Sequence, residues 1–107
     1  MGAWSYLAAA IVLEILATTL LKMSDGFAKW HWGILSIIFY SACFWVLAPA
    51  LKMLPVGIVY AIWSGAGIVA ITVIGAFFFD ERLALLQFLF IAMILIGAVG
   101  LQLTTKV

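Results

Sequence analysis

Long apolar stretches separated by short polar segments run along the whole chain. The apolar stretches cover about residues 4–21, 33–51, 56–79 and 83–103. A helix of about 20 apolar residues crosses the ~30 Å hydrocarbon core of a bilayer, so each stretch is long enough to span it once. The pattern predicts an all-α membrane protein with four transmembrane helices per chain, forming a single domain over residues 1–107.

Composition supports this class and gives no sign of other chemistry. The 107 residues are 69% hydrophobic and 8% charged, whereas about a quarter of the residues of a soluble domain are charged. Cys43 is the only cysteine, which excludes an intrachain disulfide and a metal site built on a pair of cysteines. We therefore expect no metal, no cofactor and no nucleic-acid partner. The first stretch is too long for a removable signal peptide.

The chain does not have the residues of an enzyme site. The sequence offers no Ser/His, Cys/His or metal-ligand cluster, and its single histidine, His31, lies in the first polar segment between two tryptophans. A lone histidine in a loop cannot assemble a catalytic group of this kind. We predict that the protein is not an enzyme.

Glu14 is the one charged residue inside the first apolar stretch. It lies ten residues after the start of the stretch and seven before its end, or ~15 Å and ~10 Å, too deep for its short side chain to reach the headgroups. An ionised acid at that depth costs at least about 2.5 kcal/mol, and desolvation favours its neutral form. We expect Glu14 to face protein or water and to bind and release a proton. A hydrogen bond that only holds helices together is the alternative.

Several residues share the helical face of Glu14. Leu7, Ala10, Ala17 and Thr18 are spaced three, four or seven residues from it, which places them on its side of a helix. The small residues among them let helices approach closely, which is their usual role in membranes, or leave space for a substrate. Packing is the favoured interpretation of the small residues taken alone.

Two aromatic residues of the third stretch, Tyr60 and Trp63, fall on one helical face. Trp63 sits more than one turn inside the stretch, although tryptophans of the aromatic belt belong at the membrane surface. Aromatic rings beside a carboxylate bind a lipophilic cation, so both are candidates for the site, and Tyr40 is a candidate for its wall. Core packing is the alternative. Gly65 and Gly67 weaken the helix and predict a hinge there, or a helix contact.

Lysine and arginine give almost no preferred orientation in the membrane. Four spans put Lys52 and Lys106 on one side and Lys22, Lys29 and Arg82 on the other, a count of two against three. Orientation follows this count, so the near-tie predicts insertion both ways up and an antiparallel homodimer. A single orientation fixed by another feature is the alternative.

Four segments resemble one family, the small multidrug resistance transporters. They are EILATTLLK from Glu14, SDGF from Ser24, LPVGIVYAIWSGAGIV from Leu54 and FDERL from Phe79. The resemblance covers nearly the whole chain. It implies a multi-pass protein of the cell inner membrane that works as an antiparallel dimer in the lipid bilayer.

The resemblance also implies roles for residues. Glu14 binds protons and lipophilic cation substrates in competition, Tyr60 and Trp63 line the site with Tyr40 nearby, and the region from Gly65 to Gly67 bends during exchange. Gly97 and Gly100 form the close contact between subunits in the fourth span. Phe90 departs from the family pattern, because members often have a small residue two turns before the glycine at position 97.

Ala17 and Cys43 occupy the two positions that distinguish the branches of the family. Guanidinium exporters tend to have tryptophan and serine at these two positions, whereas a small residue followed by Thr18 resembles the branch that exports bulky quaternary and aromatic cations. Cys43 departs from that branch as well. The sequence thus predicts a proton-coupled antiporter for hydrophobic or quaternary ammonium cations. A guanidinium or polyamine exporter and an accessory subunit of a larger membrane complex are the alternatives.

Overall fold

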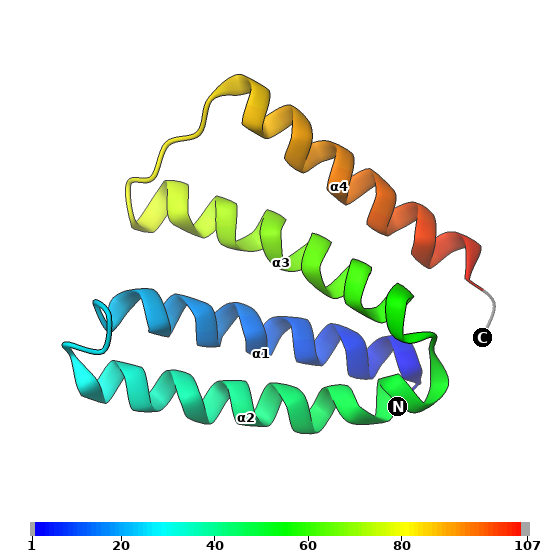
Figure 1. The fold of residues 1–107 in the computed structure, drawn as a ribbon, viewed down its shortest axis with the longest axis horizontal. Helices are drawn as coiled ribbons and strands as arrows, with labels where there is room; N and C mark the ends of the chain where they lie inside the picture. Colours follow the sequence, from blue (N-terminus) through cyan, green and yellow to red (C-terminus); the bar gives the residue numbers. More distant parts are fainter. Residues whose placement is uncertain (1, 106–107) are drawn as a thin grey trace. The chain divides into compact units, whose positions relative to one another are not determined.

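The computed structural model describes residues 2–105, so Lys106, which the charge count includes, lies outside the described residues. Within this range the chain forms four helices, each long and apolar enough to cross a membrane (Figure 1). They are α1 (Ala3–Met23), α2 (Trp30–Met53), α3 (Val56–Phe78) and α4 (Leu85–Thr104). The prediction of an all-helical protein with four potential spans is confirmed.

The helix boundaries differ from the predicted spans by up to three residues. α2 begins at Trp30, three residues before the predicted start at residue 33. The three aromatic residues 30–32 therefore belong to the helix. α4 begins at Leu85, two residues later than predicted. The Gln87 side chain accepts the backbone N–H of Ala84 at 2.8 Å and so satisfies a donor at the start of α4.

The helices divide into two hairpins, one ending at Met53 and the other beginning at Leu54. α1 contacts α2 in the first hairpin, and α3 contacts α4 in the second. Figure 1 shows each pair running in opposite directions around a short connection.

The seam between α1 and α2 is built from small residues that repeat every seven positions. The buried residues include Ala3, Ala10 and Ala17 on α1 and Ser36, Cys43 and Ala50 on α2. Seven-residue spacing keeps one face of each helix against its partner, and small side chains let the two backbones approach closely.

Two side chains hydrogen-bond across this seam. The Ser36 hydroxyl donates to the Ala17 carbonyl at 2.8 Å, and the Cys43 thiol donates to the Ala10 carbonyl at 3.2 Å. The pairs step along the two helices in opposite chain order, which fixes their antiparallel register.

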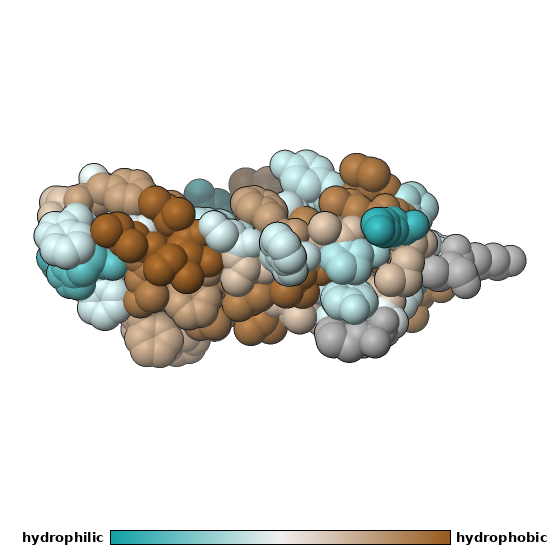
Figure 2. Space-filling view, turned by 90° about the horizontal axis from the view of Figure 1, so that it is seen from below, coloured by the Kyte–Doolittle hydropathy of each residue, from teal (hydrophilic) through white to brown (hydrophobic). Residues whose placement is uncertain are grey.

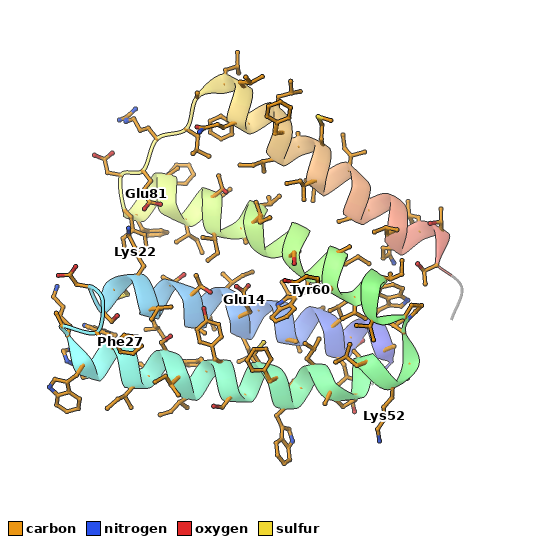
Figure 3. The ribbon with its side chains drawn as sticks, viewed as in Figure 1. Glu14, Lys22, Phe27, Lys52, Tyr60 and Glu81 are labelled. Carbon is orange, nitrogen blue, oxygen red and sulfur yellow. The ribbon has the colours of Figure 1, made fainter. Side chains whose placement is uncertain are left out.

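The connection between α1 and α2 is held by Ser24, which is fully buried. Its hydroxyl donates to the Leu21 carbonyl and accepts the backbone N–H of Phe27. Phe27 has a φ of 68°, an uncommon value for a bulky side chain. Its ring lies where a Cβ on Gly33 would be, so this turn depends on glycine at position 33 (Figure 3).

The second hairpin is packed over a smaller part of its length. A Cβ on Gly65 of α3 would lie 3.0 Å from the Ala98 Cβ and 3.3 Å from Ile94 Cγ2, so the glycine permits the close approach of α4. Ala98 is the one buried residue of α4. Ile91 and Leu101 are half-buried, and the other large apolar residues of α4 are exposed, as expected of side chains that face lipid or another chain.

Polar groups are concentrated near helix ends. On the face drawn in Figure 2, the strongest hydrophilic colouring lies close to the ends of the helices, and the surface between them is mostly brown or pale. This distribution suits helices that cross an apolar layer.

Candidate functional site

Glu14 projects from the middle of α1 (Figure 3). It lies 11 residues after the first residue of α1 and nine before its last, which corresponds to about 16 Å and about 14 Å along the axis. Its side chain is half-buried. The structure therefore places the carboxyl midway along a helix that is long and apolar enough to span a membrane.

Glu14, Thr18 and Tyr40 form a hydrogen-bonded chain between α1 and α2. The Thr18 hydroxyl donates to Glu14 Oε1 at 2.9 Å, and its oxygen lies 2.5 Å from the Tyr40 hydroxyl oxygen. Since the only hydroxyl proton of Thr18 goes to Glu14, Tyr40 must donate to Thr18. Phe44 stacks on the Tyr40 ring, with centroids 6.5 Å apart and an angle of 20° between the planes.

The second carboxyl oxygen of Glu14 has different surroundings. Glu14 Oε2 is buried and has no hydrogen-bond partner among residues 2–105. A buried ionised oxygen without a partner is costly, whereas a proton or a cation at this oxygen would remove the cost. The two oxygens thus differ, because Thr18 donates to one and the other has no partner in the described residues.

Two further predicted site residues, Leu7 and Ala10, are buried in the structure. Leu7 is 2% exposed and Ala10 is fully buried, and the Ala10 carbonyl accepts the Cys43 thiol. Their packing role is visible in the structure, and their contact with a substrate stays a prediction.

Tyr60 and Trp63 come from α3 and lie against each other. Their ring centroids are 6.2 Å apart with an angle of 66° between the planes, an edge-to-face arrangement typical of aromatic pairs. The Tyr60 side chain is 65% exposed. The two residues form one aromatic surface in the second hairpin, and their place beside Glu14 stays a prediction.

The four glycines with predicted roles have two kinds of surroundings. Gly65 and Gly67 are buried in α3, which continues as a helix through both, and Gly65 meets α4 directly. A Cβ on Gly97 or Gly100 would meet nothing within 4 Å. The close approach of α4 explains why position 65 is a glycine. The hinge at Gly65 and Gly67 and the subunit contact at Gly97 and Gly100 remain predictions.

Ser36 was not anticipated from the sequence. It is fully buried, and it donates to the carbonyl of Ala17. Ala17 is the residue before Thr18, which donates to Glu14. Its spacing of seven from Cys43 and fourteen from Ala50 would have identified it as a seam residue. No group of three His, Cys, Asp or Glu side chains that could hold a metal comes together in residues 2–105.

Four apolar helices with a carboxyl midway along the first define a multi-pass membrane protein. Residues 2–94 match the sequence model of a family described as Small Multidrug Resistance protein. The chain belongs to the small multidrug resistance family, which confirms the resemblance seen in its motifs.

Three similar proteins illustrate the relationship. The chain is 41% identical over 106 residues to the multidrug transporter EmrE of Escherichia coli strain K12, covering 99% of this chain and 96% of the relative. It is also 41% identical over 106 residues, with the same coverage, to the quaternary ammonium compound-resistance protein QacE of Escherichia coli.

The third relative is an uncharacterized membrane protein, YvaE, of Bacillus subtilis strain 168. It is 39% identical over 104 residues, which cover 97% of this chain and 87% of the relative. The names of the first two relatives describe transport and resistance, consistent with the prediction that this chain is not an enzyme.

Proposed function

We propose that the protein is a proton-coupled antiporter that exports hydrophobic or quaternary ammonium cations, with Glu14 exchanging protons for substrate. The observation that carries this proposal is the asymmetry of the Glu14 carboxyl. Thr18 donates to Oε1, while Oε2 is buried without a hydrogen-bond partner in the described residues.

Competition for one carboxylate accounts for the coupling. A proton on Glu14 neutralises the charge that would attract a cation, and a bound cation stabilises the ionised carboxylate and so opposes protonation. Because either ligand compensates the same buried charge, release of one favours binding of the other. Exchange then needs no further titratable group in the span.

Thr18 and Tyr40 keep the carboxyl oriented in this mechanism. With Glu14 ionised, Tyr40 donates to Thr18 and Thr18 donates to Oε1, as in the structure. These two hydrogen bonds stabilise the ionised Glu14 carboxylate. They leave Oε2 as the oxygen that takes the proton or faces the cation.

Tyr60 and Trp63 supply the aromatic surface for the organic cation. Their edge-to-face pair presents ring faces, which attract cations through the ring quadrupole. A quaternary ammonium ion has no N–H to donate, so it depends on such surfaces and on the Glu14 charge.

Cys43 and Ala17 favour quaternary or aromatic cations over guanidinium compounds. The Cys43 thiol donates to the Ala10 backbone carbonyl, so its one donor is directed at the seam. Ala17 is buried against α2 and brings no aromatic ring beside Glu14. Relatives that are named for resistance to quaternary ammonium compounds support the same choice.

The active assembly in this proposal is an antiparallel homodimer in the cell inner membrane. Three observations support it: the two-against-three count of lysine and arginine, the exposed apolar side chains of α4 and the open space beside Gly97 and Gly100. A second copy that packs on α4 would use those glycines for close approach.

Transport by purified protein in liposomes tests the proposal. A pH gradient should drive uptake of tetraphenylphosphonium by the wild-type protein, with no other protein present. Glu14→Gln should abolish this uptake, because glutamine fills a similar volume and cannot exchange a proton. Glu81→Gln makes the same change in an exposed connection and should leave transport intact.

Two results would contradict the proposal. Wild-type rates of pH-driven uptake in the Glu14→Gln protein would remove Glu14 from the exchange. A wild-type protein that transports only after a second protein is added would favour the accessory-subunit alternative.

A further inference from the structure

The face of α2 that points away from α1 carries a groove of about 530 Å³, here called the α2 groove. Its lining residues are Ser41, Phe44, Trp45, Ala48, Pro49 and Lys52. They are spaced three and four residues apart and so follow one stripe of the helix. Figure 3 shows Lys52 near the end of α2, directed away from α1.

The length of the α2 groove matches one leaflet of a bilayer. From Ser41 to Lys52 it extends over 11 residue steps, or about 16 Å along the helix axis. Half of a ~30 Å hydrocarbon core is about 15 Å. Since Lys52 stands one residue before the end of α2, the groove runs from the headgroup level to near the bilayer centre.

The shape of the groove suits an acyl chain. Ala48 and Pro49 have small side chains and lie along the helix between Lys52 and the aromatic residues of the lining. Trp45 is 84% exposed and Phe44 is 53% exposed. Trp45 lies seven residues, about 10 Å, deeper than Lys52, so its ring is below the interfacial level where exposed tryptophans usually lie.

The charge at the outer end selects the occupant. Lys52 is exposed and has no ion-pair partner among the residues that the structure describes. The lining contains no acidic residue, so the Lys52 ammonium is the only formal charge in the groove. A phosphate at the headgroup level supplies the missing negative charge.

We propose that the α2 groove binds one phospholipid with a net negative headgroup. The phosphate lies against the Lys52 ammonium, and one acyl chain runs over Ala48 and Pro49 beside the Trp45 ring. This site is separate from Glu14 and does not depend on proton coupling or on the identity of the transported cation.

Native mass spectrometry of the detergent-solubilised protein tests this site. Phosphatidylglycerol and phosphatidylcholine with identical acyl chains are added in parallel. Lys52→Gln should reduce phosphatidylglycerol binding about fivefold, the factor that corresponds to one lysine near an anionic surface, and should abolish the preference over phosphatidylcholine. Lys52→Arg should keep both.

Lys29→Gln is the matched control for charge, because Lys29 is an exposed lysine in the connection before α2. It should leave the lipid preference unchanged. Trp45→Leu should weaken binding of both lipids, whereas Trp30→Leu, at a residue that is 67% exposed, should not. Phe44 is left intact because it stacks on Tyr40 of the candidate transport site.

Four outcomes would overturn the proposal. The first is equal binding of the two lipids by the wild-type protein, and the second is an equal effect of the Lys29 and Lys52 variants. The third is lipid binding to monomers but not to dimers, which would assign the groove to a second copy. The fourth is displacement of phosphatidylglycerol by tetraphenylphosphonium, which would assign it to substrate.

Discussion

The two hairpins differ in how completely their own residues pack them. The seam of α1 and α2 repeats small residues every seven positions and contains two hydrogen bonds from side chains to the facing backbone. In the second hairpin, Gly65 meets Ala98 closely, and α4 has only that one buried residue.

This difference has a physical basis in the membrane. Lipid tails are as apolar as leucine, so apolar area alone does not drive helices together, and close packing and hydrogen bonds must do so. The first hairpin has both kinds of contact within one chain. We infer that it forms a stable unit around Glu14, while α4 depends on a second copy for part of its packing.

The largest predicted effect concerns the orientation of that second copy. Removing Lys22 and Arg82 should favour one orientation, and removing Lys52 and Lys106 the opposite one, because lysine and arginine near span ends decide insertion. Cells that express either variant alone should lose resistance to quaternary ammonium compounds completely. Cells that express both variants should regain it.

Labelling of a C-terminal tag on the unaltered protein provides the control. Impermeant reagents should reach the tag from both sides of the membrane in comparable amounts. Labelling from one side only, together with resistance in cells that express a single variant, would exclude the antiparallel homodimer and leave a parallel dimer or a partner chain.

A larger side chain should destabilise the first hairpin more than the second. Ala17→Leu inserts a larger side chain at a fully buried seam position and should lower the free energy of unfolding by about 1–3 kcal/mol. Ala92→Leu makes the same change at an exposed position of α4 and should have little effect. Thermal unfolding in detergent measures both, and equal losses would contradict the difference between the hairpins.

Trp63 tests what the second hairpin adds to binding. Trp63→Ala should weaken binding of tetraphenylphosphonium by about 0.5–2 kcal/mol through loss of a cation–ring contact, while proton binding at Glu14 should change much less. Titration calorimetry measures the cation affinity directly. An unchanged affinity would remove Trp63 from the site.

The smallest predicted effect is that of one seam hydrogen bond. Ser36→Ala removes the bond to the Ala17 carbonyl and should lower the free energy of unfolding by about 0.6 kcal/mol, the average for such bonds in membranes. Ser41 is the matched control, because it is exposed and bonds only within its own helix, to Ile37. A loss for Ser41→Ala as large as that for Ser36→Ala would show that the seam bond adds no stability of its own.

Much of the fold could be predicted from hydropathy, since spans are long and polar segments between them are few. The position of Glu14 midway along α1 also followed from counting residues. The hydrogen bonds of Thr18 were harder to predict from the sequence. The spacing of Glu14 and Thr18 predicts that they share a helical face, but it does not predict that Tyr40 reaches the Thr18 hydroxyl.

Other features depend on contacts between residues that are distant in sequence. Leu7 and Ala10 share the side of α1 that carries Glu14, and the structure buries both, with the Ala10 carbonyl bonded to Cys43 of α2; helical periodicity alone does not predict this burial. Likewise, Gly65 was predicted as part of a hinge, and the structure gives it a second explanation in the approach of Ala98.

The central claim is that proton and cation compete for Glu14, and proton release on cation binding tests it most directly. Tetraphenylphosphonium is added to purified protein in weakly buffered solution at a series of pH values, and the released protons are counted. The wild-type and Glu81→Gln proteins should release protons as the cation binds, and Glu14→Gln should release none. Equal release by the Glu14→Gln protein would contradict the account.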